Sequence, residues 1–72
     1  MKSVSGKELA KVVERHGWSL LRINGSHHIL KKPGHANTLS VPVHGNRPVA
    51  TGTLRSLIRD AGLTVEEFIA LL

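Results

Sequence analysis

The stretch that decides the fold of this 72-residue chain is residues 18–32, WSLLRINGSHHILKK. Two short runs of β-forming residues, 18–24 and 27–32, are separated by the pair Gly25-Ser26. Two such runs joined by a turn that contains Asn-Gly, here Asn24-Gly25, are typical of an antiparallel hairpin. We therefore predict two paired strands here, joined by a tight turn.

A third strand is predicted at residues 38–44, because apolar residues stand there at every second position. The breaker-rich segment 33–37, PGHAN, separates it from the hairpin as a second turn. Pro42 has no backbone N–H to donate, so we expect this strand to lie at an edge of the sheet or to end at Pro42.

Two stretches have the capping-box form, in which a hydroxyl residue and a glutamate three positions later bond each other's backbone amides. They are SGKE, from Ser5 to Glu8, and TVEE, from Thr64 to Glu67. The first predicts a helix over residues 6–16, and the second predicts a short helix at the end of the chain.

Another helix is predicted to open at residues 51–53, with Thr51 or Thr53 as its cap, and to end at Gly62. The order α-β-β-β-α-α favours one α+β domain over residues 1–72, with a three-stranded antiparallel sheet covered by helices on one face. The α-β-β-β-α part is also the order of the double-stranded-RNA-binding fold. The residues expected in the core are Leu9, Val13, Trp18, Leu54, Ile58 and Phe68.

The charge of the chain is +5, and it is unevenly distributed. From Arg15 to Arg59 there are seven basic residues and no acidic one until Asp60. Such a block favours a polyanionic partner, because each neutralised phosphate releases counterions. The alternative is ordinary solubilising charge. Only two aromatic residues occur, Trp18 and Phe68, so contact with phosphate and sugar is expected rather than stacking on bases.

The size and composition of the chain limit the kinds of site and cofactor that it can have and its location in the cell. A chain this short has a thin core with little room for a deep pocket, so we expect a shallow site acting on a polymer and no organic cofactor. There is no cysteine, which excludes disulfides and thiolate metal sites and suits a reducing cytosol. No apolar run approaches the roughly 18 residues of a membrane span, so we expect a cytoplasmic protein.

The chain has five histidines and no clustered pair of carboxylates, so histidine is the obvious candidate for acid–base catalysis near neutral pH. His27 and His28 are consecutive on a predicted strand and should point to opposite faces, so they are poorly placed to share a metal ion. His35 and His44 lie on turns and could converge with one of them, but no metal site is expected. Ser26 lacks a nearby carboxylate to complete a triad.

What remains is a histidine near Lys31 and Lys32, which suits metal-free RNA cleavage. That reaction needs a base for the ribose 2′-hydroxyl, a cation for the charge on phosphorus and an acid for the leaving oxygen. The alternative is that His27 or His28 only caps the hairpin or completes the sheet.

The string GSHHILKKPG at residues 25–34 resembles the HicA toxin family, also called YcfA-like. The resemblance extends in the same order over nearly the whole chain. The other matching segments are SGKEL (5–9), HGW (16–18), LRI (21–23), LSVPVH (39–44), GTLRSLI (52–58) and AGL (61–63).

The resemblance implies a ribosome-independent mRNA interferase that a HicB-type antitoxin keeps silent. It implies that His27, directly after Gly25-Ser26, is catalytic, with Gly25, Ser26 and His28 as the supporting motif. Many members of the family, but not all, have a histidine at the position of His28. The family often has His-Pro where this chain has Lys32-Pro33, so a histidine is missing at position 32.

Basic residues expected to contact RNA phosphates are Arg22, Lys31, Lys32, Arg47 and Arg55. The alternative function is a binding module of the same fold that holds RNA without cutting it, since both functions need the basic surface and only the enzyme needs His27. An antitoxin-like DNA binder is disfavoured, because no helix-turn-helix pattern is present.

Overall fold

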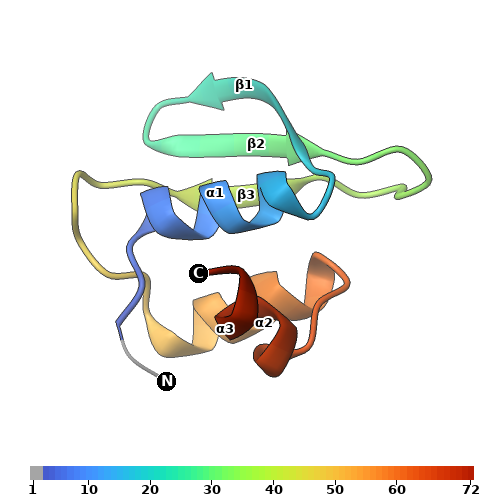
Figure 1. Cartoon of the computed structure of the whole chain (residues 1–72). Coiled ribbons are helices and arrows are strands. Elements are labelled where there is room, and N and C mark those ends of the chain that lie inside the picture. The colour runs from blue at the N-terminus through green and yellow to red at the C-terminus, as the bar shows by residue number, and fades with distance from the viewer. Residues whose placement is uncertain (1–2) are drawn as a thin grey trace.

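The computed structural model describes residues 3–72 and has the predicted element order (Figure 1). Its elements are α1 (Gly6–Arg15), β1 (Ser19–Asn24), β2 (His27–Lys31), β3 (Leu39–Pro42), α2 (Thr51–Asp60) and α3 (Val65–Leu71). The fold is therefore α+β, with a three-stranded antiparallel sheet, as the sequence predicts. Within this part of the chain, no helix is both long and apolar enough to cross a membrane.

The strands follow the order β1-β2-β3, so β2 is central and β3 is an edge strand. The third strand is shorter than the predicted 38–44 and ends at Pro42. The prediction that it would lie at an edge or end there is confirmed on both counts. Pro42 pairs with His27, the first residue of β2, so β3 has no further strand residue to pair with. The next N–H, that of Val43, donates to the Ser26 carbonyl in the turn at 2.7 Å.

One face of the sheet is packed on helices and the other is not. Leu30, Leu39 and Val41 point to the helices and are at most 2% exposed. In Figure 1, α1 lies against the sheet at β3, and α2, which also contacts β3, lies with α3 on the side away from β1.

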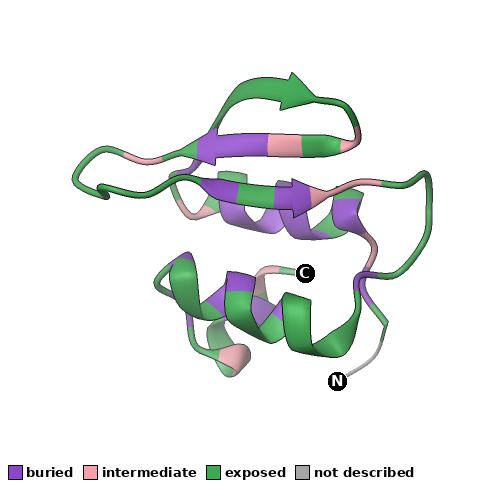
Figure 2. Ribbon diagram, turned by 180° about the vertical axis from the view of Figure 1, so that it is seen from behind, coloured by how far each residue is buried: buried purple, intermediate pink, exposed green. Residues whose placement is uncertain are grey.

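We call the other side of the sheet the open face. The strand register assigns to it Ser19, Arg22, Asn24, His27, Ile29, Lys31, Ser40 and Pro42. Figure 2 shows β1 exposed along its whole length and β2 exposed at its two ends. Ile29, in the middle of the central strand, lies between Arg22 and Ser40 and is only 8% exposed.

The core consists of one cluster between the sheet and the three helices. All six residues expected there are at most 3% exposed: Leu9, Val13, Trp18, Leu54, Ile58 and Phe68. The Trp18 indole Nε1–H donates to the Ala61 carbonyl at 3.2 Å, which satisfies its one polar atom inside the core.

Both predicted capping boxes are confirmed. The Ser5 side chain accepts from the Glu8 amide at 3.2 Å, and Glu8 accepts from the Ser5 amide at 3.0 Å. Thr64 and Glu67 form the same pair at 3.1 and 2.9 Å. The hydrogen bond from the Thr64 backbone amide, with that from its hydroxyl, lowers the pKa of the Glu67 carboxyl.

Two helix ends differ from the prediction. Helix α1 stops at Arg15, with His16 as its C-cap, one residue earlier than expected. Helix α2 is not capped by Thr51 or Thr53: its N-cap is Ala50, which offers no side-chain hydrogen bond. The Val49 N–H, directly before this cap, donates to the Val4 carbonyl at 2.8 Å. This long-range hydrogen bond holds the chain at residue 49, and the helix begins at Thr51.

Candidate active site

The site is built on the turn between β1 and β2. Gly25 has φ +62°, and no non-glycine residue in 3–72 has a positive φ, so Ser26 is on the negative side. A positive φ at the first of two central residues is the pattern of a type II′ hairpin turn, which requires glycine at that place. The turn makes His27 the first residue of β2 and pairs it directly with Asn24.

His27 and His28 lie on opposite faces of the sheet, as predicted. His27 stands between Asn24 on β1 and Pro42 on β3. Its side chain belongs to the open face and is exposed. His28 stands between Ile23 and Val41 on the helix side and is half-buried. The two imidazoles are therefore separated by the sheet.

Arg22 is the basic residue nearest to His27 on the open face. It pairs with Ile29, two pairs along from the Asn24–His27 pair and the next pair on the same face, so Arg22 is a diagonal neighbour of His27. Diagonal neighbours of this kind are about 7–8 Å apart, within reach of a long side chain. Lys31 shares the face, but it is four residues along the strand, about 13 Å away at ~3.3 Å per residue.

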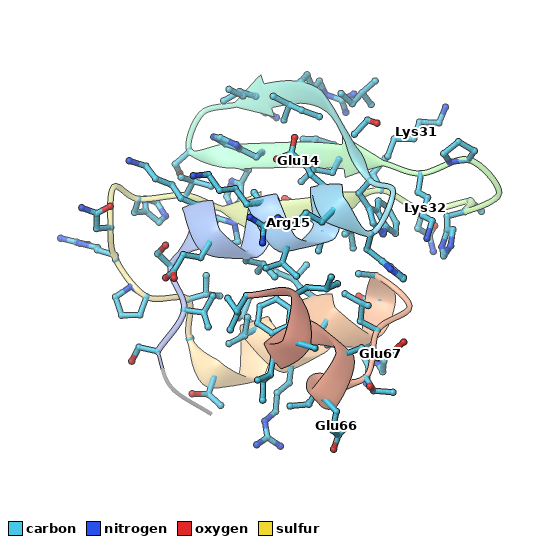
Figure 3. The ribbon with its side chains drawn as sticks, in the orientation of Figure 1. Glu14, Arg15, Lys31, Lys32, Glu66 and Glu67 are labelled. Carbon is cyan, nitrogen blue, oxygen red and sulfur yellow. The ribbon has the colours of Figure 1, made fainter. Side chains whose placement is uncertain are left out.

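The remaining predicted RNA contacts do not gather around His27. Lys32 is half-buried, and its Cε lies 3.2 Å from the place where a Cβ on Gly17 would stand, so its stem packs on the end of α1. Figure 3 shows Lys31 and Lys32 side by side at the loop end of β2, away from the turn. Arg55 is exposed on α2, in the helical layer.

Arg47 lies near the hairpin turn but not on the open face. It lies in the loop that follows β3, and its N–H donates to the His44 carbonyl at 3.0 Å. The loop starts beside the hairpin turn, where Val43 bonds Ser26. Arg47 is therefore at the His27 end of the molecule, off the open face.

The other histidines have separate places. The His35 ring packs on Trp18 with centroids 5.1 Å apart, at the opposite end of β2 from His27. His16 caps α1, and His44 is exposed in the loop after β3. In residues 3–72, no three side chains of the His, Cys, Asp or Glu type gather in a way that could hold a metal ion.

All the carboxylate side chains of the chain lie on helices. They are Glu8 and Glu14 on α1, Asp60 on α2, and Glu66 and Glu67 on α3. Figure 3 shows Glu66 and Glu67 on α3, on the far side of the helical layer from β1. The strands β1, β2 and β3 thus carry Arg22 and Lys31 but no carboxylate.

Asn24 belongs to this site without being part of a sequence motif. It is exposed, stands directly opposite His27 and has the only polar side chain in the row Asn24–His27–Pro42 besides the histidine itself. A two-residue turn by itself places residue 24 opposite residue 27, so the spacing alone could have identified it.

The comparison with curated proteins finds no match to this chain. A family model described as the HicA toxin of bacterial toxin-antitoxin matches residues 6–63. The matched part contains α1, the whole sheet with its His27 turn, and α2. The chain therefore belongs to the HicA toxin family of bacterial toxin–antitoxin systems.

Proposed function

We propose that the chain is an endoribonuclease toxin that cleaves mRNA without a metal ion, with His27 as its catalytic residue. We further propose that it acts in the cytoplasm and that its antitoxin partner is of the HicB type. The observation that carries this proposal is the place of His27, exposed on an acid-free open face with Arg22 as its diagonal neighbour two pairs away.

The chemistry follows from these groups. His27 accepts the proton of a ribose 2′-hydroxyl, and the 2′-oxygen attacks the adjacent phosphorus. The bond from phosphorus to the 5′-oxygen breaks, and that oxygen takes its proton from water at the open surface. The products are a 2′,3′-cyclic phosphate and a 5′-hydroxyl. The Arg22 guanidinium is the nearest cation for the negative charge that develops on the phosphoryl oxygens.

The surface suits a flexible polymer. The open face is not enclosed by any helix, and its charged side chains, Arg22 and Lys31, are both cationic. A single RNA strand can lie along β2 with one phosphate near Arg22 and another near Lys31. The absence of carboxylates from this face removes the repulsion that would oppose such binding.

The experiment compares His27→Ala with His28→Ala on purified protein and synthetic RNA without ribosomes. Loss of one acid–base group typically reduces the rate by about 10²–10⁴-fold, so His27→Ala should fall in that range. His28→Ala is the matched control on the other face and should have the smaller effect. Cleavage by His27→Ala at the unmodified rate would contradict the catalytic assignment.

The same assay examines the reaction type. The unmodified chain should cleave equally well in EDTA, and its products should end in a cyclic phosphate or a 3′-phosphate. Products with a 3′-hydroxyl, or activity that chelation removes and magnesium restores, would indicate a metal mechanism. RNA binding by the unmodified chain with no cleavage at all would favour the non-catalytic binding module of the same fold.

A further inference from the structure

We propose that Asn24 positions the His27 imidazole and sets which of its ring nitrogens carries the proton. The inference deepens the proposed function and rests on it for the chemistry, while the pairing that it uses is a property of the fold. It assigns a role to a residue that lies outside the Gly25-Ser26-His27 motif.

The geometry comes from the turn. In a two-residue hairpin, the residues on either side of the loop are direct cross-strand partners with side chains on the same face. Asn24 and His27 form that pair, and such pairs have Cβ atoms about 4.5–5.5 Å apart. On its other side His27 faces Pro42, which offers no side-chain hydrogen bond. Asn24 is therefore the polar group best placed to hold the ring.

The chemistry favours an amide at this place. The Asn24 side-chain oxygen can accept from Nδ1–H, which leaves the Nε2 lone pair directed away from the turn and free to accept a proton from RNA. When the ring becomes charged, the same bond stabilises the imidazolium. A carboxylate would orient the ring as well, but it would repel the phosphate that must approach His27.

The charged surroundings are consistent with this role. On β1 the charged group facing His27 is Arg22, on β2 it is Lys31, and β3 contributes none. A neutral acceptor directly beside the ring can therefore orient it without cancelling the positive surface that an RNA phosphate approaches.

The first test measures cleavage kinetics of Asn24→Ala against RNA concentration. Loss of one orienting hydrogen bond should reduce kcat about five- to tenfold and leave KM within about twofold. Ser19→Ala is the matched control, because Ser19 lies on the same strand and face but at the far end, opposite Lys31. An unchanged kcat and pH profile for Asn24→Ala would overturn the proposal.

The second test uses no RNA and follows the His27 and His28 imidazoles by NMR. Asn24→Ala should shift the His27 nitrogen signals toward the Nε2–H tautomer, because the acceptor for Nδ1–H is gone. Asn24→Asp should move the His27 titration midpoint upward by about half a pH unit or more, since an adjacent carboxylate favours the charged ring. Ile23→Asp, the matched control on the other face, should move His28 instead.

The two tests separate the two proposals. A shift of His28 rather than His27 in Asn24→Asp, or unchanged His27 signals in Asn24→Ala, would overturn the role of Asn24 even if the chain cleaves RNA. Failure of the unmodified chain to cleave RNA would overturn the proposed function, while the NMR signals would still report whether Asn24 holds the ring.

Discussion

At the scale of single residues, the element that carries a basic side chain decides whether that side chain lies on the same face as His27. Arg22 and Arg55 are both exposed arginines, but Arg22 lies on the open face and Arg55 lies on α2 in the helical layer. The two residues differ in place while the chemistry of their side chains is the same. They form a matched pair for testing which surface binds RNA.

We expect Arg22→Ala to weaken RNA binding and to make its salt dependence shallower. Each phosphate contact with a single strand contributes about 0.7 to the slope of log K against log salt concentration, so that much of the slope should be lost. Arg55→Ala should leave the slope unchanged. Binding constants measured at several salt concentrations decide this, and a larger effect of Arg55→Ala would place the RNA on the helical layer.

At the scale of elements, the contact between the start of α1 and the end of β3 explains a glycine. Gly6, the first residue of α1, is buried, and a Cβ added to it would overlap the Pro42 carbonyl oxygen and lie 3.0 Å from the Pro42 carbonyl carbon. Both neighbours are backbone atoms, which cannot rotate away. The helix and the strand can approach this closely only because residue 6 has no side chain.

Gly6→Ala should therefore destabilise the fold by about 1–3 kcal/mol, the usual cost of forcing extra volume into a packed site. Gly52→Ala is the control in the first turn of α2, where an added Cβ meets nothing within 4 Å. That change should stabilise the protein by about 0.4–1 kcal/mol, because alanine restricts the unfolded chain. Urea midpoints measure both effects. A Gly6→Ala variant with an unchanged urea midpoint would contradict the close approach of α1 to the Pro42 backbone.

At the scale of the whole molecule, charge is divided between two layers. Every carboxylate side chain lies on a helix, whereas the open face carries Arg22 and Lys31 alone as charged groups. A negatively charged protein surface can match this face, and such complementarity speeds association and discriminates between partners. RNA and an acidic antitoxin would then compete for the same surface, and inhibition would need no conformational change in the toxin.

We expect the antitoxin to cover His27 and to displace RNA from the open face. Mixing labelled RNA, this chain and its antitoxin should show direct competition, and Arg22→Ala should weaken both interactions if the two ligands share that residue. Arg55→Ala serves again as the control variant. A complex in which the antitoxin binds elsewhere and leaves His27 open to solvent would contradict the masking mechanism, although the ribonuclease proposal would survive.

Local features of the sequence determined the elements and the faces of the sheet. The glycine-first turn, the two capping boxes and the alternation of β2 depend on residues at most three or four positions apart. The same short-range rules separate His27 from His28 and place Asn24 opposite His27. The six expected core residues are buried for a similar reason, because apolar periodicity shows which side of each element turns inward.

Only the tertiary structure decided which basic residues share a surface with His27. Lys32 follows Lys31 directly in sequence yet packs on the end of α1, and Arg55 lies in another layer. The uncapped start of α2 and the lack of a side chain at Gly6 likewise depend on contacts with Val4 and Pro42, more than thirty residues away in the chain. Sequence spacing specifies the direction of a side chain within its own element, but relative positions of elements arise from packing between distant segments, which no local pattern encodes.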